Sequence, residues 1–217
     1  MKTKKILWII LMIAPLLMLL AVYGKLPAQV PMHWGIDGSV NRYGEKWELF
    51  PVAGLNILFG ILMPLMAKID PKRRNYARFQ GTYDWMILWL LGFMTVMMGL
   101  TLAEAMEPGR FNMSKWVCAM VAILFISLGN MMPKVKRNYF TGVKTPWALS
   151  SDAVWNKTQR LGGKFFVFGG ILMLICALCF SPMISMIMTI TVAIGICLVP
   201  TVMSYIWYQR ESKETEE

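Results

Sequence analysis

The residues that could carry out chemistry are few in this chain of 217 residues. There is one histidine, His33, whereas a zinc site usually needs several His or Cys ligands. Cys176 and Cys179 form a Cys-x-x-Cys pair, a spacing used by redox and metal sites. The surrounding stretch LICALCF is wholly apolar, and such surroundings keep thiols unreactive. We therefore predict that both cysteines are buried core residues.

Motifs of the common enzyme classes are also missing from the sequence. It contains no pair of histidines, no G-x-S-x-G nucleophile motif and no glycine-rich phosphate loop. The sequence therefore predicts that the protein is not an enzyme and that it holds neither a metal ion nor a cofactor.

Three polar residues stand inside or at the ends of apolar runs. Glu104 is close to Glu107 and to an outer turn, so we expect its carboxylate to reach water by snorkelling. Asn56 and Asn130 are expected to form hydrogen bonds between helices. No run carries the chain of acids or histidines that a proton relay needs, which argues against an ion-coupled transporter.

The elements that must position these residues are membrane spans. The chain is 57% hydrophobic and only 16% charged, more apolar than a soluble domain. A transmembrane helix needs about 20 apolar residues. Five stretches between charged residues are long enough to hold such helices: 6–24, 49–67, 85–103, 116–133 and 165–209. Each of the first four is one span long. The last is two spans long, and Ser181-Pro182 marks a break between them. The fold class is thus an all-α integral membrane protein with six transmembrane helices.

The positive charges indicate how the helices are oriented. If the N-terminus lies inside, seventeen of the 22 Lys and Arg residues fall in inner segments and five in outer segments. Such a bias predicts that the protein crosses a plasma membrane several times with both termini in the cytoplasm. The net charge of +10 therefore faces anionic lipid and cytosol, and we expect no direct binding of nucleic acid.

The outer segment 25–48 is rich in proline and glycine, so we expect a compact turn-rich loop without a long helix. Together with the flanking spans it forms a predicted N-terminal helical hairpin, residues 1–68. Residues 69–217 form a predicted four-helix membrane region.

The most informative segment is the inner loop 134–164, which is basic and contains several aromatic residues. Ser150, Ser151 and Asp152 are good N-cap residues, and Gly162-Gly163 is a helix stop signal. Val154, Thr158 and Leu161 lie on one face of the intervening stretch. We therefore predict a short amphipathic helix from Asp152 to Leu161 that lies in the membrane interface.

Two stretches of the sequence carry a family resemblance. The longer one follows the pattern Gly129-Asn130…Pro133-Lys134…Asn138-Tyr139…Gly142-Val143-Lys144-Thr145-Pro146-Trp147-Ala148-Leu149…Val154-Trp155…Thr158…Arg160…Gly163. It resembles the SdpI family of bacterial immunity proteins against a secreted killing peptide derived from SdpC. The segment Leu26-Pro27…Val30-Pro31-Met32-His33-Trp34…Gly38…Asn41-Arg42-Tyr43…Lys46 is similar to the N-terminal domain that often precedes this region. The family often has Arg before Thr-Pro-Trp, where this chain has Lys144.

The resemblance implies a membrane protein that protects its cell from a secreted antimicrobial peptide and that also sequesters a cytosolic ArsR-type repressor when toxin is bound. We expect the toxin to meet the outer loop at His33, Trp34, Asp37, Tyr43 and Lys46. The inner motif is expected to be structural or to bind a partner, through Asn130, Pro133, Lys134, Asn138, Tyr139, Gly142, Lys144, Thr145, Pro146, Trp147, Trp155, Thr158 and Arg160. Two alternatives are a small transporter or exporter of a peptide or lipid-like compound, and a membrane enzyme that acts on lipid headgroups.

Overall fold

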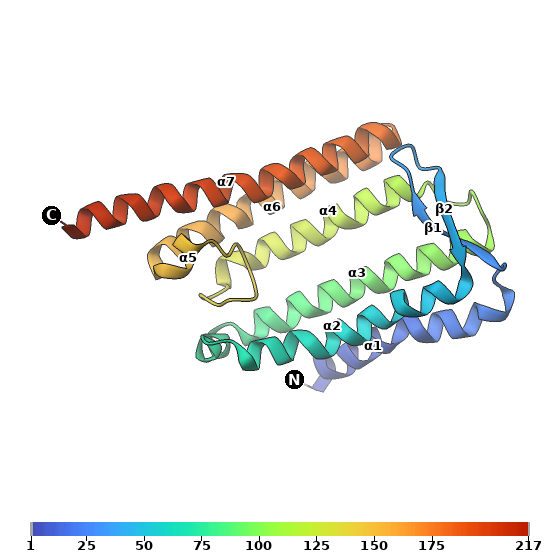
Figure 1. Cartoon of the computed structure of the whole chain (residues 1–217), viewed down its shortest axis with the longest axis horizontal. Coiled ribbons are helices and arrows are strands. Elements are labelled where there is room, and N and C mark those ends of the chain that lie inside the picture. Colours follow the sequence, from blue (N-terminus) through green and yellow to red (C-terminus); the bar gives the residue numbers. More distant parts are fainter. Residues whose placement is uncertain (1, 217) are drawn as a thin grey trace.

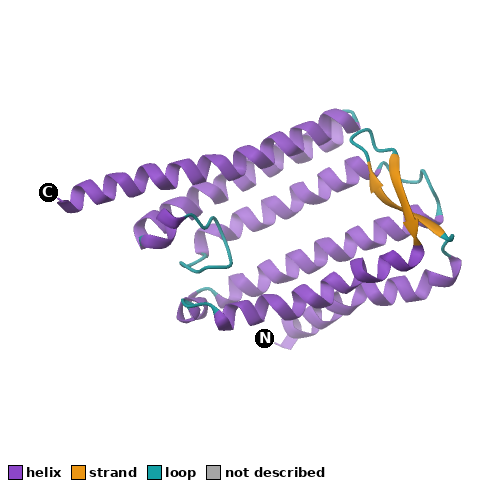
Figure 2. Cartoon of the chain, viewed as in Figure 1, coloured by secondary structure: helices purple, strands orange, loops and turns teal. Residues whose placement is uncertain are grey.

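The structure, a computed structural model, describes residues 2–216 and the side chains of residues 3–214. It consists of long, roughly aligned helices with a small β-hairpin at one end (Figures 1 and 2). In chain order the helices and strands are α1 (Lys2–Val22), β1 (Gln29–Trp34), β2 (Val40–Glu45), α2 (Leu49–Ile69), α3 (Gln80–Met106), α4 (Met113–Met131), α5 (Pro146–Ser150), α6 (Asp152–Cys179) and α7 (Pro182–Glu216).

Six helices of the described residues are long and apolar enough to cross a membrane: α1, α2, α3, α4, α6 and α7. This confirms the six predicted spans. The break between the last two spans is where the sequence predicted it, because α6 ends at Cys179 and Pro182 begins α7. Proline fits the first position of a helix, where its missing N–H is not needed.

The helices pack as two groups. Helix α1 contacts α2 and α3, while α4 contacts α6, and α6 contacts α7; α3 and α4 join the two groups. Helices α4 and α6 approach closely at glycines. A Cβ atom at Gly129 would lie 2.8 Å from the carbonyl oxygen of Gly163, and one at Gly170 would lie 2.9 Å from that of Ala122. Small residues of this kind let membrane helices pack backbone to backbone.

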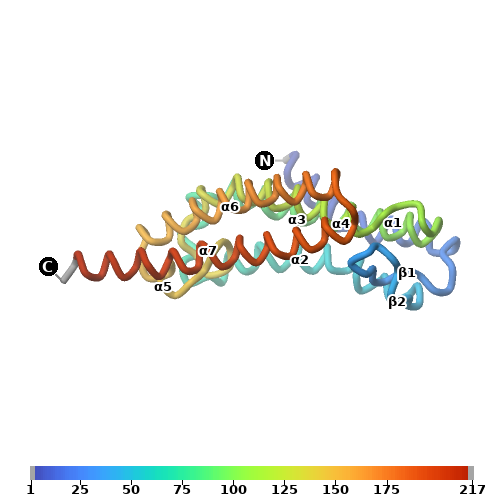
Figure 3. The backbone as a smooth tube through the Cα atoms, turned by 90° about the horizontal axis from the view of Figure 1, so that it is seen from above, coloured from blue at the N-terminus to red at the C-terminus, as the bar shows by residue number. Residues whose placement is uncertain are grey.

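The two ends of the molecule differ. The hairpin end carries β1, β2 and the turn between α3 and α4, whereas the loop end carries residues 70–79 and 132–151 (Figure 1). The first turns of α1 and the last turns of α7 also lie at the loop end (Figure 1). In the perpendicular view, the end of α7 extends beyond the other helices (Figure 3). The first turns of α1 and the last turns of α7 thus lie at the same end of the molecule, opposite the hairpin.

The outer segment 25–48, predicted as a compact turn-rich loop without a long helix, contains a short β-hairpin. Strands β1 and β2 pair antiparallel, from Gln29 opposite Glu45 to Trp34 opposite Val40, with an irregularity beside His33. Gly38 lies in the connecting turn with a φ of 91°, a left-handed conformation that favours glycine. The prolines and glycines that exclude a helix from this segment are compatible with a short, twisted hairpin.

The prediction of a short interfacial helix over residues 152–161 is wrong about where the helix ends and about what surrounds it. Ser151 caps the helix as expected, but the helix continues through Gly162 and Gly163 to Cys179. These two glycines are contact points: a Cβ atom at Gly162 would lie 2.8 Å from the Met132 side chain, and one at Gly163 would meet the backbone of Gly129. The apolar face with Val154 and Thr158 is buried in protein and does not lie on lipid.

Candidate functional site

The predicted inner motif forms one folded unit, which we call the loop unit and define as residues 132–151. Its central residue is Asn138, which is fully buried. The Asn138 amide oxygen accepts hydrogen bonds from the backbone N–H groups of Phe140 and Thr141, at 2.9 and 2.7 Å. Its amide nitrogen donates to the carbonyls of Lys136 and Thr141. One side chain thus holds a tight turn that has no regular secondary structure.

Asp70, in the connection between α2 and α3, attaches the loop unit to the first helix group, which consists of α1, α2 and α3. Its carboxylate is fully buried. It accepts hydrogen bonds from the backbone N–H of Lys72 (2.6 Å), from the Tyr76 hydroxyl (3.0 Å) and from the backbone N–H of Tyr139 (2.8 Å). Such bonds to a charged group are the strong class. Burial, together with the adjacent Asp70 carboxylate, raises the pKa of Tyr76, so this hydroxyl stays protonated and donates.

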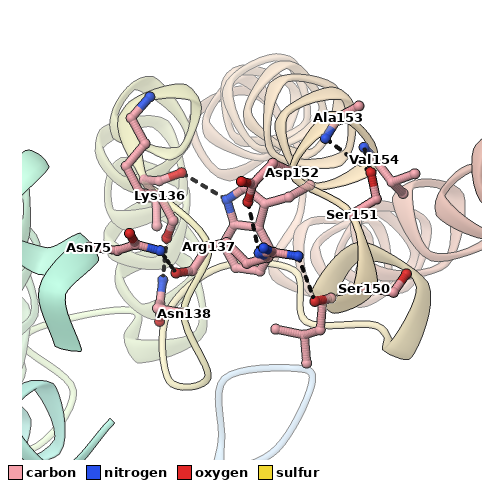
Figure 4. A network of polar contacts seen from close by, with 12 residues as sticks. Asn75, Lys136, Arg137, Asn138, Ser150, Ser151, Asp152, Ala153 and Val154 are labelled. Atoms are coloured by element: carbon pink, nitrogen blue, oxygen red, sulfur yellow. Dashed lines mark hydrogen bonds and ion pairs between the residues drawn. The ribbon is translucent and has the colours of Figure 1, made fainter. Parts of the chain in front are cut away.

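A second bridge joins the same segments at Arg137 (Figure 4). The Arg137 carbonyl accepts a 2.7 Å hydrogen bond from the Asn75 side chain. Its guanidinium lies 2.7 Å from the carboxylate of Asp152 and donates to the carbonyl of Leu149. Arg137 is therefore engaged with the first turn of α6 and with the end of α5, and it is not free to bind a partner.

Gln159 on α6 fixes the middle of the loop unit. It is buried, and its amide makes two hydrogen bonds with the backbone of Val143, donating to the carbonyl at 2.9 Å and accepting from the N–H at 3.1 Å. Gly142 has a φ of 100°, and a Cβ atom there would lie 2.5 Å from the Gln159 amide oxygen. Only glycine fits this position without strain.

The aromatic and hydroxyl residues of the motif attach the loop unit to α6 and α7. Trp155 is buried and donates a 2.9 Å hydrogen bond to the Val135 carbonyl. The Thr145 hydroxyl caps α5 at the N–H of Ala148 and lies 2.8 Å from the hydroxyl of Ser204 on α7. Trp147 packs edge-on against Tyr205, with 5.0 Å between ring centres.

The remaining predicted residues of the motif lie on its surface, apart from Thr158. The Thr158 hydroxyl is buried and donates to the carbonyl of Val154 in its own helix. Tyr139 is 44% exposed although its backbone is held by Asp70. The other exposed members are Asn130, Pro133, Lys134, Lys144, Pro146 and Arg160. The Lys144 ammonium donates a 3.1 Å hydrogen bond to the Phe140 carbonyl. Among the described residues, the Asn130 side chain has no hydrogen-bond partner, so the expected interhelical bond is wrong for this residue.

The hairpin is held on the ends of the helices. Val30 is fully buried among residues of α1, α2 and α3, and the hydroxyl of Ser114 on α4 donates to the carbonyl of Gly35. The ammonium of Lys46 lies 4.7 Å from the ring centre of Tyr23 and donates to its carbonyl. The hairpin therefore contacts both helix groups.

Three of the other four predicted outer residues present their side chains to solvent. His33 and Asp37 are exposed, and Tyr43 is 55% exposed. The His33 ring lies 2.7 Å from the Asn41 amide oxygen, and the Asp37 carboxylate accepts from Ser39, which lowers the pKa of Asp37. Trp34 is half-buried. Within the described residues, no group of three or more His, Cys, Asp or Glu side chains could hold a metal ion.

The polar residues of the spans have structural partners. Asn56 donates to the Leu11 carbonyl, the Leu91 carbonyl and the Thr95 hydroxyl, so it links α1, α2 and α3 as predicted. Glu104 does not snorkel to water. It is buried, and its two carboxylate oxygens accept from the backbone N–H groups of Gly109 and Phe111 in the following turn.

The cysteine prediction is correct for one member of the pair only. Cys176 is buried, whereas Cys179 is exposed at the end of α6.

Sequence reasoning missed Asp70, Asn75, Gln159 and Ser204, each of which has a hydrogen-bond partner at least 16 residues away. Asp70 precedes Pro71, and Asp-Pro is a common turn start, which was the one local signal.

Comparison with known proteins agrees with the resemblance seen in the sequence. Residues 134–204 match the SdpI/YfhL protein family, and residues 10–57 match a domain of unknown function (DUF1648). The chain is 21% identical to the protein named "Immunity protein SdpI" of Bacillus subtilis (strain 168) over 208 residues, which is 95% of this chain and 97% of that protein. No solved structure matches the chain.

Proposed function

Because residues 134–204 of the chain belong to the SdpI/YfhL family, and because nearly the whole chain aligns with a protein named as an immunity protein, we propose that it is a membrane immunity protein. It protects the producing cell from a secreted antimicrobial peptide. The observation that carries the proposal is the alignment over 95% of the chain, which includes both the hairpin and the loop unit.

The orientation follows from charge. With the loop end in the cytoplasm, the basic residues of segments 68–78 and 134–164 face the anionic inner leaflet. The hairpin end then lies outside and is the first part that a secreted peptide meets. Its rigid attachment to the helices and its exposed residues His33, Asp37 and Tyr43 suit a preformed peptide-binding surface. The half-buried Trp34 and Lys46 belong to the same proposed surface.

We propose that the loop unit transmits the effect of toxin binding to the cytosolic side and does not itself bind the toxin. Asn138 of the unit, and Gln159 and Trp155 of α6 beside it, all make hydrogen bonds with backbone groups of the unit. Tyr139 and Lys144 at its surface, and Arg160 on α6, are exposed and available to a cytosolic protein such as an ArsR-type repressor. Coupling requires two states, and the bonds of Asp70 and Asn75 to the loop unit are where the two helix groups could shift against each other.

The proposal is tested with purified full-length chain in liposomes and a labelled killing peptide. An immunity protein that acts by binding retains peptide on the vesicles without moving it into the lumen. Tyr43→Ala and Asp37→Ala should weaken this retention, whereas Glu107→Ala, at an exposed position in the neighbouring turn, should not. Accumulation of peptide inside the vesicles would instead support the transporter function. If the Tyr43→Ala and Asp37→Ala variants retain as much peptide as wild type, the proposed contact surface is refuted.

A further inference from the structure

Two neighbouring cavities open between α1, α2 and α3 at the loop end, away from the loop unit. One has a volume of about 570 Å³ and the other about 850 Å³. Trp8, Gln80 and Asp84 line both cavities, so the two adjoin at these residues, and we refer to them together as the helix space. Neither the family match at residues 134–204 nor the hairpin contributes to it.

One part of this space is strongly basic. Its lining includes Lys68, Arg73 and Arg74 in one cavity and Lys4 and Lys5 in the other. Among the described residues, Asp84 is the one carboxylate in the lining, and it accepts a 2.7 Å hydrogen bond from Gln80. Among the described residues, Arg73 and Arg74 have no acidic partner. Five cations against one carboxylate favour an anionic group.

The N-terminus of α3 adds to this potential. The helix begins at Gln80 without a side-chain cap and without an acidic residue in its first turn. Gln80 and Gly81 both line the cavities, so the positive end of a 27-residue helix lies at their wall. The Lys4 ammonium is held at the same place, 3.4 Å from the Gly81 carbonyl and 4.9 Å from the ring centre of Trp85.

The other part of the space is an apolar slot that runs along the helices. Ile9 and Met12 of α1, Gly60 of α2 and Leu88 of α3 line it. Along α1, the distance from Lys4 to Met12 is about 12 Å at 1.5 Å per residue. The cavity lining, from its basic part to the end of the slot, therefore extends about 12 Å along α1, compared with about 15 Å for one hydrocarbon leaflet. A soluble anion would use the basic part alone and leave this slot empty.

We propose that this space is a binding site for one anionic glycerophospholipid of the leaflet at the loop end. Its phosphate lies against Lys68, Arg73 and Arg74, and an acyl chain lies in the slot beside Met12 and Leu88. The site would make the N-terminal helix group dependent on lipid composition. The site does not depend on toxin binding, so it stands or falls separately from the proposed immunity function.

The experiment uses the full chain in detergent and measures retained lipid by native mass spectrometry during titration with phosphatidylglycerol or phosphatidylethanolamine. Wild-type protein should retain one phosphatidylglycerol in preference to phosphatidylethanolamine. A basic side chain near an anionic surface contributes about 1 kcal/mol, so Arg73→Gln with Arg74→Gln should weaken phosphatidylglycerol binding about 30-fold. The matched control, Lys157→Gln with Arg160→Gln, removes two exposed basic residues of α6 that do not line the site and should leave binding unchanged.

Free glycerol phosphate separates a lipid site from a simple phosphate site. It carries the anionic group but has no acyl chain to occupy the slot, so it should not displace bound phosphatidylglycerol at equal concentration. Displacement by glycerol phosphate would overturn the proposal, as would equal retention of the two lipids. An equal loss of binding in the α6 control would overturn it too, because the effect would then be one of total charge.

Discussion

Replacing Asp70 by alanine tests whether the buried carboxylate holds the loop unit to the first helix group. The change removes three hydrogen bonds, from the N–H of Lys72, the hydroxyl of Tyr76 and the N–H of Tyr139. The last of these joins residues 69 positions apart. The truncation leaves these donors without their charged acceptor.

The magnitude follows from the burial of these groups. A hydrogen bond to a charged group contributes about 1.5 to 3 kcal/mol net, and a buried donor left unsatisfied costs about 1 to 3 kcal/mol. Water can enter the space left by the carboxylate and recover part of this loss. We therefore expect Asp70→Ala to lower the free energy of unfolding by about 3 to 5 kcal/mol, and the midpoint of thermal unfolding by about 10 °C. Asp70→Asn keeps one of the two acceptor oxygens, so its free energy of unfolding should lie between those of Asp70→Ala and wild type.

The assay is thermal unfolding of the purified chain in detergent, with trypsin cleavage at Lys136 and Lys144 as a local readout. Asp84→Ala is the matched control, because it removes a carboxylate at the same end of the molecule with a single side-chain partner, Gln80. It should shift the midpoint by about 2 °C or less. If Asp70→Ala unfolds at the same temperature as Asp84→Ala, and its loop stays resistant to trypsin, the role assigned to Asp70 is refuted.

Three further changes probe the same unit in the unfolding assay. Gly142→Ala places a side chain on left-handed backbone and should lower the free energy of unfolding by about 2 kcal/mol. The control Gly24→Ala, where a Cβ atom meets nothing within 4 Å, should lower it by less than about 0.5 kcal/mol. Equal losses in the two variants would contradict the argument from the backbone conformation of Gly142. Trp155→Phe loses the bond to the Val135 carbonyl and should cost about 1 to 3 kcal/mol; an unchanged midpoint would show that this bond is dispensable. The pKa of Tyr76 is raised by burial, so its contribution is intact below the ordinary tyrosine pKa of about 10 and declines as pH rises above it. Stability should therefore fall less steeply above pH 10 in Tyr76→Phe than in wild type, and parallel profiles would contradict this.

The membrane spans could be predicted from the sequence because each depends on a local property. A run of apolar residues between charges must form a helix in lipid, since no other partner is available for its backbone. The same holds for the break at Pro182 and the cap at Ser151. These signals lie within a few residues of the feature they determine.

The errors came from features that only packing decides. Gly162-Gly163 has the composition of a helix stop, yet in the structure these glycines allow α6 to pass close to Gly129. A local pattern cannot distinguish a glycine that ends a helix from one that makes room for a neighbour. Glu104 was misjudged for a similar reason, because its partners are backbone groups of the following turn and not water.

The candidate site was found in part. The motif residues of the loop unit were identified, and their function as a structural unit was one of the two expectations. Their partners Asp70 and Gln159 were missed because hydrogen bonds across 69 and 16 residues leave no periodic signal. The orientation of the helices, the domain boundary at residue 68, the toxin contact and the repressor stay predictions.

The most direct test of the central claim is survival of the producing cell. The gene is deleted, the cells are challenged with the secreted killing peptide, and the intact gene is returned on a plasmid. The account predicts that deletion makes the cells sensitive and that the wild-type chain restores survival, while a stably inserted chain with Tyr43→Ala and Asp37→Ala restores it poorly. Unchanged survival of the deletion strain, in a background without a second related gene, would contradict the proposed immunity function.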